Sequence, residues 1–319
     1  MRGTGPDLPA ARAPFPVTSP YRVVPAPRPL GDEPHVIVDA AYPAALRRRM
    51  QRLDSDRAGV QVRDLPERDD AGLAAALRAS WNLLPWPRNG STVALPLLGA
   101  EVDLDTATAR SIGPSDFPDA TDELLRHQGL DLLVTGWQLA CSDDLVVLRR
   151  EGPGRLRAEL LAVAFPSGWP PRRRAGAGLL DLHRPVADGE RLQRAAPALS
   201  EALLTKGPYV QFVWGLDPDG RLDRDPSAPD HPGTRVTPPA RDWWLRVERQ
   251  TTMPLPRWGR ASFVIRPFLT PVTELTTTQR RTLGDAIASM SPPALAYKGI
   301  EDVRDELVDW LQFSPGSAG

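Results

Sequence analysis

Cysteine is nearly absent from this chain, because Cys141 is the one cysteine among 319 residues. A single thiol excludes an internal disulfide framework and a four-cysteine iron–sulfur cluster held by this chain alone. The sequence contains no run of about 18 apolar residues, the length of a transmembrane helix. It also contains no Gly-x-Gly-x-x-Gly fingerprint for a dinucleotide. Any electrons that the protein uses are therefore expected to come from another protein.

Charge of one sign is not in excess either, since 39 Lys and Arg stand against 40 Asp and Glu. A balanced chain gives no reason to expect nucleic acid or an anionic membrane as the partner. The first residues are rich in Pro and Arg and contain no apolar signal-peptide core. We therefore expect a soluble, cytoplasmic protein that binds neither nucleic acid nor a membrane.

Proline, by contrast, is abundant, with 36 in the chain, while 41% of the residues are hydrophobic. This composition predicts a folded protein with many irregular connections. We expect four parts: an extended or disordered arm over 1–34, a helical segment over 35–128 that packs on the core, a main domain over 129–299, and a C-terminal helix and tail over 300–319. A polar, Pro-rich insertion over 217–241 interrupts the main domain.

Apolar periodicity predicts helices near both ends of the chain. The first runs over 42–53, and its basic run, Arg47 to Arg49, is interpreted as a solvated helix face. A second helix is expected after a cap at Asp69 or Asp70, because an apolar stripe follows at helical spacing. Further helices are expected over 121–127, 190–205, 279–290 and 300–313.

Strand-like segments are expected between residues 130 and 268. Two of them flank an acidic turn whose residues, Asp143 and Asp144, are interpreted as mainly structural. A separate strand-like segment covers 209–216. We expect a five-stranded antiparallel sheet, the strand count of a PAS-like domain, within an α+β fold; its strands would be 132–139, 145–149, 156–165, 245–251 and 261–268.

The hairpin over 245–268 carries several charges in what otherwise resembles core sequence. Alternation puts Arg249 on the same side as Leu245 and Val247, and Glu248 on the opposite side. A buried guanidinium requires an anion or several acceptors, because desolvation of the lone charge costs several kcal/mol. The partner of Arg249 is expected to be a carboxylate or a ligand.

The same hairpin resembles a known family. Its ERQT, the turn LPRWG and the strand SFVIRPF are similar to the signature of the heme-binding subunit of heme-dependent oxidative N-demethylase and its relatives. Three other stretches follow the family order: FPSGW at 165–169, LHRPV at 182–186 and YKG at 297–299. Relatives typically read Arg, one residue, Asn, Trp where this chain has Gln211, Val213 and Trp214.

The resemblance implies a set of site residues. His183, inside LHRPV, would be the axial ligand of the heme iron, because a neutral imidazole ligates iron while its other nitrogen is oriented by an acceptor. Arg249 would stabilise bound dioxygen and Glu248 would pair with an alkylammonium. Arg246, Arg266 and Lys298 are candidate partners of the heme propionates, with surface salt bridges or a solvated lysine as the alternative roles.

The implied activity is that of a heme-dependent oxidative enzyme. It would use heme b, dioxygen and electrons from separate flavin and iron–sulfur reductase chains to oxidise a small amine or a related molecule. One alternative is a PAS-type heme sensor without turnover. A second alternative is a paralogue that has lost heme and serves as a structural subunit.

Overall fold

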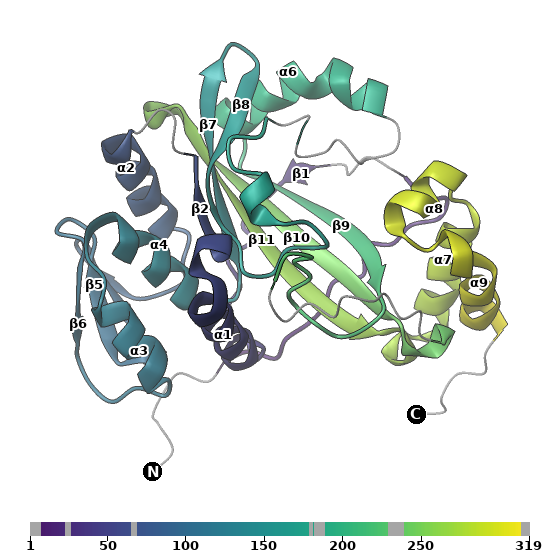
Figure 1. The fold of residues 1–319 in the computed structure, drawn as a ribbon, viewed down its shortest axis with the longest axis horizontal. Coiled ribbons are helices and arrows are strands. Elements are labelled where there is room, and N and C mark those ends of the chain that lie inside the picture. Colours follow the sequence, from purple (N-terminus) through teal and green to yellow (C-terminus); the bar gives the residue numbers. More distant parts are fainter. Residues whose placement is uncertain are drawn as a thin grey trace.

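A computed structural model describes residues 8–22, 27–64, 69–178, 181, 189–228 and 239–313. Within them the chain is an α+β protein built around a seven-stranded antiparallel sheet, with a separate four-stranded sheet at one side (Figure 1). The expected α+β class is confirmed. None of the described helices is long and apolar enough to cross a membrane.

The large sheet has the strand order β1-β9-β10-β11-β7-β8-β2. Two short strands form its edges, and five long consecutive strands, β7 to β11, form its body. The first and last of these five, β7 and β11, are neighbours. The sheet thus has more strands than the expected five; the bounds are β1 Arg28–Pro29, β2 Gln61–Arg63, β7 Asp144–Gly152, β8 Arg155–Ala162, β9 Tyr209–Asp217, β10 Trp244–Leu255 and β11 Arg260–Pro271.

The expected strand over 132–139 is wrong, because this stretch lies in helix α4 (Gly129–Leu139). Every residue from 132 to 139 is buried, so the helix is enclosed on all sides. At Gly136 an added Cβ would lie 2.9 Å from the Trp81 ring, which shows how closely α4 meets its neighbour. A short apolar run without periodicity does not distinguish a buried helix from a buried strand.

The hairpin of β10 and β11 is confirmed, although its ladder is longer than expected. It continues through Pro254, opposite Ala261, as far as Leu255 and Arg260. The expected strands, by contrast, ended at residue 251 and resumed at residue 261. The neighbouring strand β9 pairs with β10 only as far as Thr252. Pro254 therefore lies beyond this pairing, where the lack of a backbone N–H removes no hydrogen bond to β9.

Alternation along β10 defines two faces of the sheet. Arg246, Glu248 and Gln250 point to one side, the Glu248 face, which packs against the loop 165–178 and helix α6 (Gly189–Thr205). Leu245, Val247 and Arg249 point to the other side, the Arg249 face. That face is covered by the N-terminal helices at one end and by the C-terminal helices at the other.

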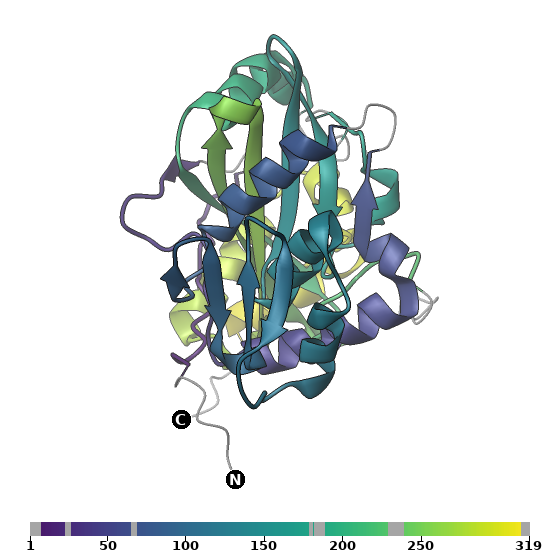
Figure 2. The ribbon, with the colours of Figure 1, turned by 90° about the vertical axis from the view of Figure 1, so that its left-hand side faces the viewer.

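The remaining elements surround this sheet. The small sheet and the helices beside it occupy the side that faces the viewer in Figure 2, and their buried side chains share one core with β7, β8 and β11. The bounds are β3 Arg88–Asn89, β4 Thr92–Leu95, β5 Ala100–Asp103, β6 Thr108–Ser111, α1 Tyr42–Val60, α2 Asp70–Trp81, α3 Pro118–Leu125, α7 Thr277–Ala288, α8 Pro292–Lys298 and α9 Arg304–Phe313.

The basic run of α1 is solvated at Arg47, which is exposed, and partly at Arg48, but that interpretation is wrong for Arg49. This side chain is fully buried, on the same side of the helix as Leu46 and Leu53. Its guanidinium donates to the carbonyl of residue 138 in the last turn of α4 and to those of residues 141, 142 and 143 in the turn after it. It also donates to the Asp144 carboxylate at 3.1 Å. The turn contributes the acceptors that make burial of this charge tolerable.

Candidate functional site

Three stretches that are distant in sequence meet at the Glu248 carboxylate. The Ser167 hydroxyl donates to Glu248 Oε1, and Gln250 Nε2 donates to Oε2 at 2.9 Å. Gln211, on β9, donates through Nε2 to Gln250 Oε1 at 2.8 Å. Pairing of β9 with β10 places Gln211 directly opposite Gln250, which puts both amides on the same face.

The loop that carries Ser167 is held at its first residues. The Asp144 carboxylate accepts the N–H groups of Ala164 at 3.0 Å and Phe165 at 2.9 Å. Arg246 Nη2 donates to the Phe165 carbonyl at 2.7 Å. Both charged groups are buried, and they fix the backbone two residues before Ser167. Asp144 is therefore a structural residue, as the sequence suggested, and its effect extends to the site.

Arg246 also joins this loop to the segment after β9. Its Nη1 donates to the Leu222 carbonyl at 2.9 Å, and Asp217 lies 3.5 Å from the same nitrogen. Backbone hydrogen bonds between Gly168 and Arg224, and between Arg224 and Pro166, connect the two segments directly. Both terminal nitrogens of Arg246 thus donate hydrogen bonds to backbone carbonyls of the protein. Its Nε lies 3.6 Å from Glu248 Oε1.

Lys298, at the end of α8, approaches the same region from the edge of β9. Its Nζ donates to the Trp214 carbonyl and lies within 5.8 Å of the ring centroids of Tyr21, Trp214 and Tyr297. Burial lowers the pKa of Lys298 to about 8, while the nearby Glu248 charge opposes that shift. Burial, with the Glu248 charge, also raises the pKa of Tyr297.

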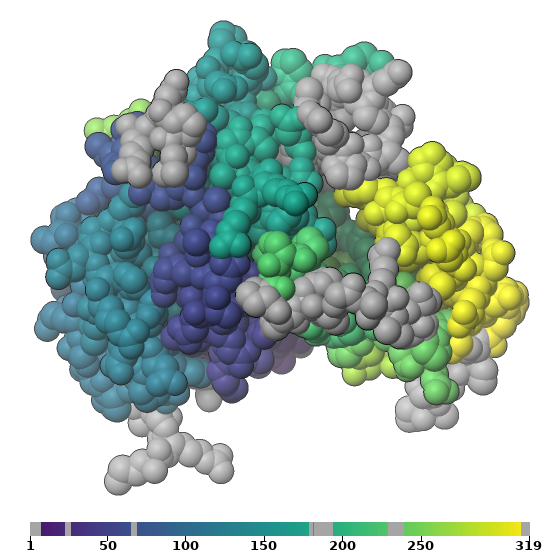
Figure 3. All heavy atoms as spheres, in the orientation of Figure 1, coloured from purple at the N-terminus to yellow at the C-terminus, as the bar shows by residue number. Residues whose placement is uncertain are grey.

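The surface beside Glu248 is open along β9. Val213, opposite Glu248, and Gly215 are partly exposed although β9 is paired along this stretch. A Cβ added at Gly215 would have no described atom within 4 Å. In the space-filling view the surface is recessed between the yellow C-terminal helices and the green segment after β9 (Figure 3). Among the described residues, the Glu248 face therefore leaves space beside β9.

A family model described as "Haem-dependent oxidative N-demethylase, alpha subunit-like" matches residues 119–308. The chain belongs to this family. The match includes every stretch that meets at Glu248, from FPSGW to YKG. The family's description names a haem-dependent oxidative enzyme and one subunit of it, which implies an assembly with other subunits.

Within this family member, Arg249 and Arg266 do not share a site with Glu248. Arg249 donates to the carbonyls of Pro34 at 2.6 Å and His35 at 3.1 Å on the opposite face of the sheet. Its neighbour across the ladder, Arg266, donates to Asp39 at 2.8 Å. The predicted roles of Arg249 at bound dioxygen and of Arg266 at a propionate stay predictions, and the hydrogen bonds described here tie both side chains to the N-terminal segment. Alternation in a strand, with both partners supplied by the N-terminal segment, explains this placement.

His183, the predicted iron ligand, lies outside the described residues. Of the other predicted site residues, Glu248, Arg246 and Lys298 are on or beside the Glu248 face. Ser167, Gln211 and Gln250 were not predicted to contact Glu248. Ser167 and Gln250 lie in FPSGW and ERQT, which carried the resemblance and were the available signal. Gln211 lies where this chain departs from the family pattern.

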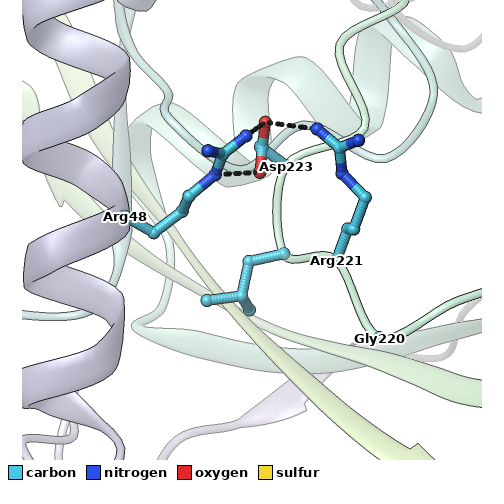
Figure 4. Close-up of a pocket in the computed structure, with 5 residues that line it drawn as sticks. Arg48, Gly220, Arg221 and Asp223 are labelled. Atoms are coloured by element: carbon cyan, nitrogen blue, oxygen red, sulfur yellow. Dashed lines mark hydrogen bonds and ion pairs between the residues drawn. The ribbon is translucent and has the colours of Figure 1, made fainter. Parts of the chain in front are cut away.

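A pocket of about 440 Å³ lies on the outer side of the segment after β9 (Figure 4). Arg48 and Arg221 face Asp223 across it, and Arg48 makes a two-point ion pair with that carboxylate at 2.6 and 2.7 Å. The described lining thus contains two guanidiniums that share one carboxylate, and Arg221 lies farther from it, at 3.9 Å. It is separate from the residues that surround Glu248.

Proposed function

We propose that this chain is the heme subunit of an oxidative enzyme and that it binds heme b on the Glu248 face to oxidise a small amine. One observation carries the proposal: stretches typical of a heme-dependent family meet at a single carboxylate beside an open surface. If Glu248 served only in a salt bridge inside the protein, no open surface would be needed beside it.

The described residues on this face fit a flat, largely apolar group with charged edges. Val213 and Gly215 leave space above β9, and Lys298 is a cation at the rim with N–H groups beyond the one that Trp214 accepts. We propose His183 as the axial iron ligand on the strength of its LHRPV match alone. Lys298 is the proposed neighbour of a heme carboxylate, and Arg246 is proposed as a second one on the strength of the resemblance alone.

Glu248 is the proposed binding group for the amine. A carboxylate forms a charge-assisted hydrogen bond with an alkylammonium, stronger than a neutral one. Bound heme would supply the binding and reduction of dioxygen, with electrons from a separate flavin and iron–sulfur reductase. Ser167 and Gln250 would keep the carboxylate in one orientation, so that the amine nitrogen is held at a fixed place.

We also propose that strands β7 to β11 form a PAS-like sheet. Five consecutive antiparallel strands, with the first and the last adjacent, support this proposal. The two short edge strands, β1 and β2, would then be additions from the N-terminal part of the chain.

Titration of the purified full chain with hemin, followed by absorption spectroscopy, tests the proposed cofactor. The wild type is expected to develop a sharp Soret band that saturates at one equivalent, and His183→Ala is expected to lose or shift it. His127→Gln is the matched control, because His127 contacts Glu123 at the end of α3 instead. A wild type without a Soret band, or an unchanged spectrum in His183→Ala, would contradict the proposal.

A further inference from the structure

Lysine is rare in this chain, and one of its two lysines is half-buried. Lys206 and Lys298 stand among 39 basic residues, and the others are arginines. Lys206 is exposed directly after α6, whereas Lys298 is half-buried at the end of α8. An arginine keeps its charge at any physiological pH, but a desolvated lysine amine loses its proton readily and is then a nucleophile. Lys298 therefore offers a chemistry that the arginines of this chain do not.

Three aromatic rings surround the Lys298 amine. Its Nζ lies 5.8, 5.4 and 5.6 Å from the ring centroids of Tyr21, Trp214 and Tyr297. The rings of Tyr21 and Trp214 meet edge to face, with their centroids 5.6 Å apart. The backbone N–H of Tyr21 donates to Ser289 Oγ at 2.8 Å, which ties this part of the N-terminal segment to α7. We call the three rings the aromatic enclosure.

The charge of Lys298 has little polar compensation. Its Nζ donates to the Trp214 carbonyl, and no carboxylate of the described residues forms an ion pair with it. Burial lowers the pKa of Lys298 to about 8, while the nearby Glu248 charge opposes that shift. At pH 8 an ordinary lysine, with a pKa of about 10.4, is neutral in about one molecule in 250. The Lys298 amine, by comparison, is neutral in about half of the molecules at that pH.

Lys298 is not fully enclosed. Its neighbour Tyr297 is 42% exposed, and Lys298 itself is partly exposed. Gly215 follows Trp214, whose carbonyl accepts from Nζ, and a Cβ added at Gly215 would meet no described atom within 4 Å. Among the described residues there is thus room for a few atoms beside the amine, which favours a small reactant.

The surroundings of Nζ also select the chemical class of the reactant. Three aromatic rings and the negative charge of Glu248 favour a cation at this place. Carbon dioxide would convert the amine into an anionic carbamate, and acylation would convert it into a neutral amide, so both reactions would give up this stabilisation. Condensation with an aldehyde gives an imine, which remains a cation once it takes up a proton. A small aldehyde is therefore the reactant that fits.

We propose that Lys298 is a nucleophilic site that forms an imine with a small aldehyde. The neutral amine attacks the carbonyl carbon, and one proton passes from nitrogen to oxygen to give a carbinolamine. The hydroxyl and the remaining N–H proton then leave as water while the C=N bond forms, and a proton from solvent converts the imine into an iminium. The inference goes beyond the proposed function and requires no heme. Because the iminium keeps the charge of the ammonium, it is compatible with a heme carboxylate beside Lys298.

Reductive trapping on the full chain tests this inference, because cyanoborohydride converts an iminium into a stable secondary amine. The probe is acetaldehyde at limiting concentration, and peptide mass spectrometry measures the rate of ethylation at Lys298 and at Lys206 in the same sample. Lys206 is the internal control, since it is exposed. At pH 7.5 Lys298 should be ethylated at least about tenfold faster than an ordinary lysine, because a much larger fraction of its amine is neutral.

The pH dependence of this rate ratio separates a tuned amine from a merely accessible one. From pH 8 to pH 10 the ratio of Lys298 to Lys206 ethylation should fall. Lys298 is already largely neutral in that range, whereas an ordinary amine continues to gain neutral molecules. The effect of pH on the reagents acts on both lysines alike, so it cancels in the ratio.

Two variants test the aromatic enclosure. Tyr21→Ala should slow the ethylation of Lys298 about three- to tenfold at pH 7.5, because water in place of the ring raises the pKa of the amine towards its ordinary value. Tyr21→Phe keeps the ring and should react as the wild type does. Circular dichroism verifies that both variants fold.

Three results would overturn the inference. Lys298 might as well be an ordinary amine if it reacted no faster than Lys206, or if the ratio of the two rates did not change with pH. An unchanged rate at Lys298 in folded Tyr21→Ala would show that the enclosure does not tune the amine. None of these results bears on the cofactor, because the Soret titration tests heme uptake separately.

Discussion

Asp143 is a buried carboxylate that its neighbours only partly compensate. Neither oxygen makes a hydrogen bond of normal geometry within the described chain, and the closest cation is Arg266 Nη1 at 3.5 Å. Burial raises the pKa of Asp143 to about 7, although Arg266 and Arg49 favour the charged form. Between about pH 4 and 7 the folded state therefore keeps a proton that the unfolded state has lost.

The contribution of Asp143 to stability is thus present at low pH and lost as the pH rises through about 7. Asp143→Asn carries no charge at this position. The free energy of unfolding of this variant, relative to that of the wild type, should therefore increase by about 1–3 kcal/mol as the pH rises from 5 to 8. Urea denaturation of both proteins at the two pH values measures this difference. A difference that does not change with pH would contradict the assignment. Asp39→Asn is the comparison, since it removes the carboxylate that Arg266 binds directly and should destabilise at pH 8.

At the residue scale, strand alternation alone predicted that Glu248 and Arg249 point to opposite faces, and the ladder confirms it. Arg249 lies 3.5 Å from the Glu33 carboxylate, in agreement with the expected carboxylate partner. Its hydrogen bonds to the backbone carbonyls of Pro34 and His35 were not predictable, because such carbonyls leave no sign in a sequence. Burial of Arg49 was missed for a related reason. A basic run on a helix usually faces water, and only the carbonyls of a distant turn reverse that expectation here.

At the scale of elements, β10 combines a ligand face with a structural face. Arg249 and Thr251 both donate to the N-terminal segment, at the carbonyls of Pro34 and His35, whereas Glu248 and Gln250 face the recess. Arg249→Met should destabilise the fold by about 2–4 kcal/mol, because it leaves two partly buried carbonyls without their charged donor.

Chemical denaturation combined with amide hydrogen exchange measures that change. Exchange should speed up in the N-terminal segment around residues 30–41, while heme uptake stays as in the wild type. Glu248→Gln should show the reverse, with little loss of stability and altered amine binding. If Arg249→Met instead kept wild-type stability and lost heme or amine binding, the assignment of the two faces would be wrong.

Helix α4 shows where reading elements from sequence failed and why. Amphipathic elements such as α2, α7 and the β10–β11 hairpin carry a period and were predicted. In α4 every residue from 132 to 139 is buried, and so apolar a run was interpreted as a strand. The short strands β3 to β6 were missed as well, because two to four residues are too few for alternation to be visible.

For the whole molecule, the family match over residues 119–308 covers the sheet's five long strands and α8. The N-terminal part nevertheless completes the protein. It supplies both edge strands of the sheet, the Arg49 anchor of the turn before β7, and the carbonyls that hold Arg249. Sequence motifs pointed to the candidate site, and long-range packing determined which of their residues lie beside Glu248.

The central claim is that heme binds on the Glu248 face, and filling the space at Gly215 tests it most directly. Gly215→Leu should fold normally, because the added side chain meets no described atom within 4 Å at its Cβ. Gly113→Leu is the matched control, since Gly113 is equally unobstructed but lies in the loop between β6 and α3. The measurement is the Soret absorbance on hemin titration, with circular dichroism to verify folding. The account predicts that Gly215→Leu loses heme uptake and Gly113→Leu retains it. A folded Gly215→Leu protein that takes up heme like the wild type would contradict it.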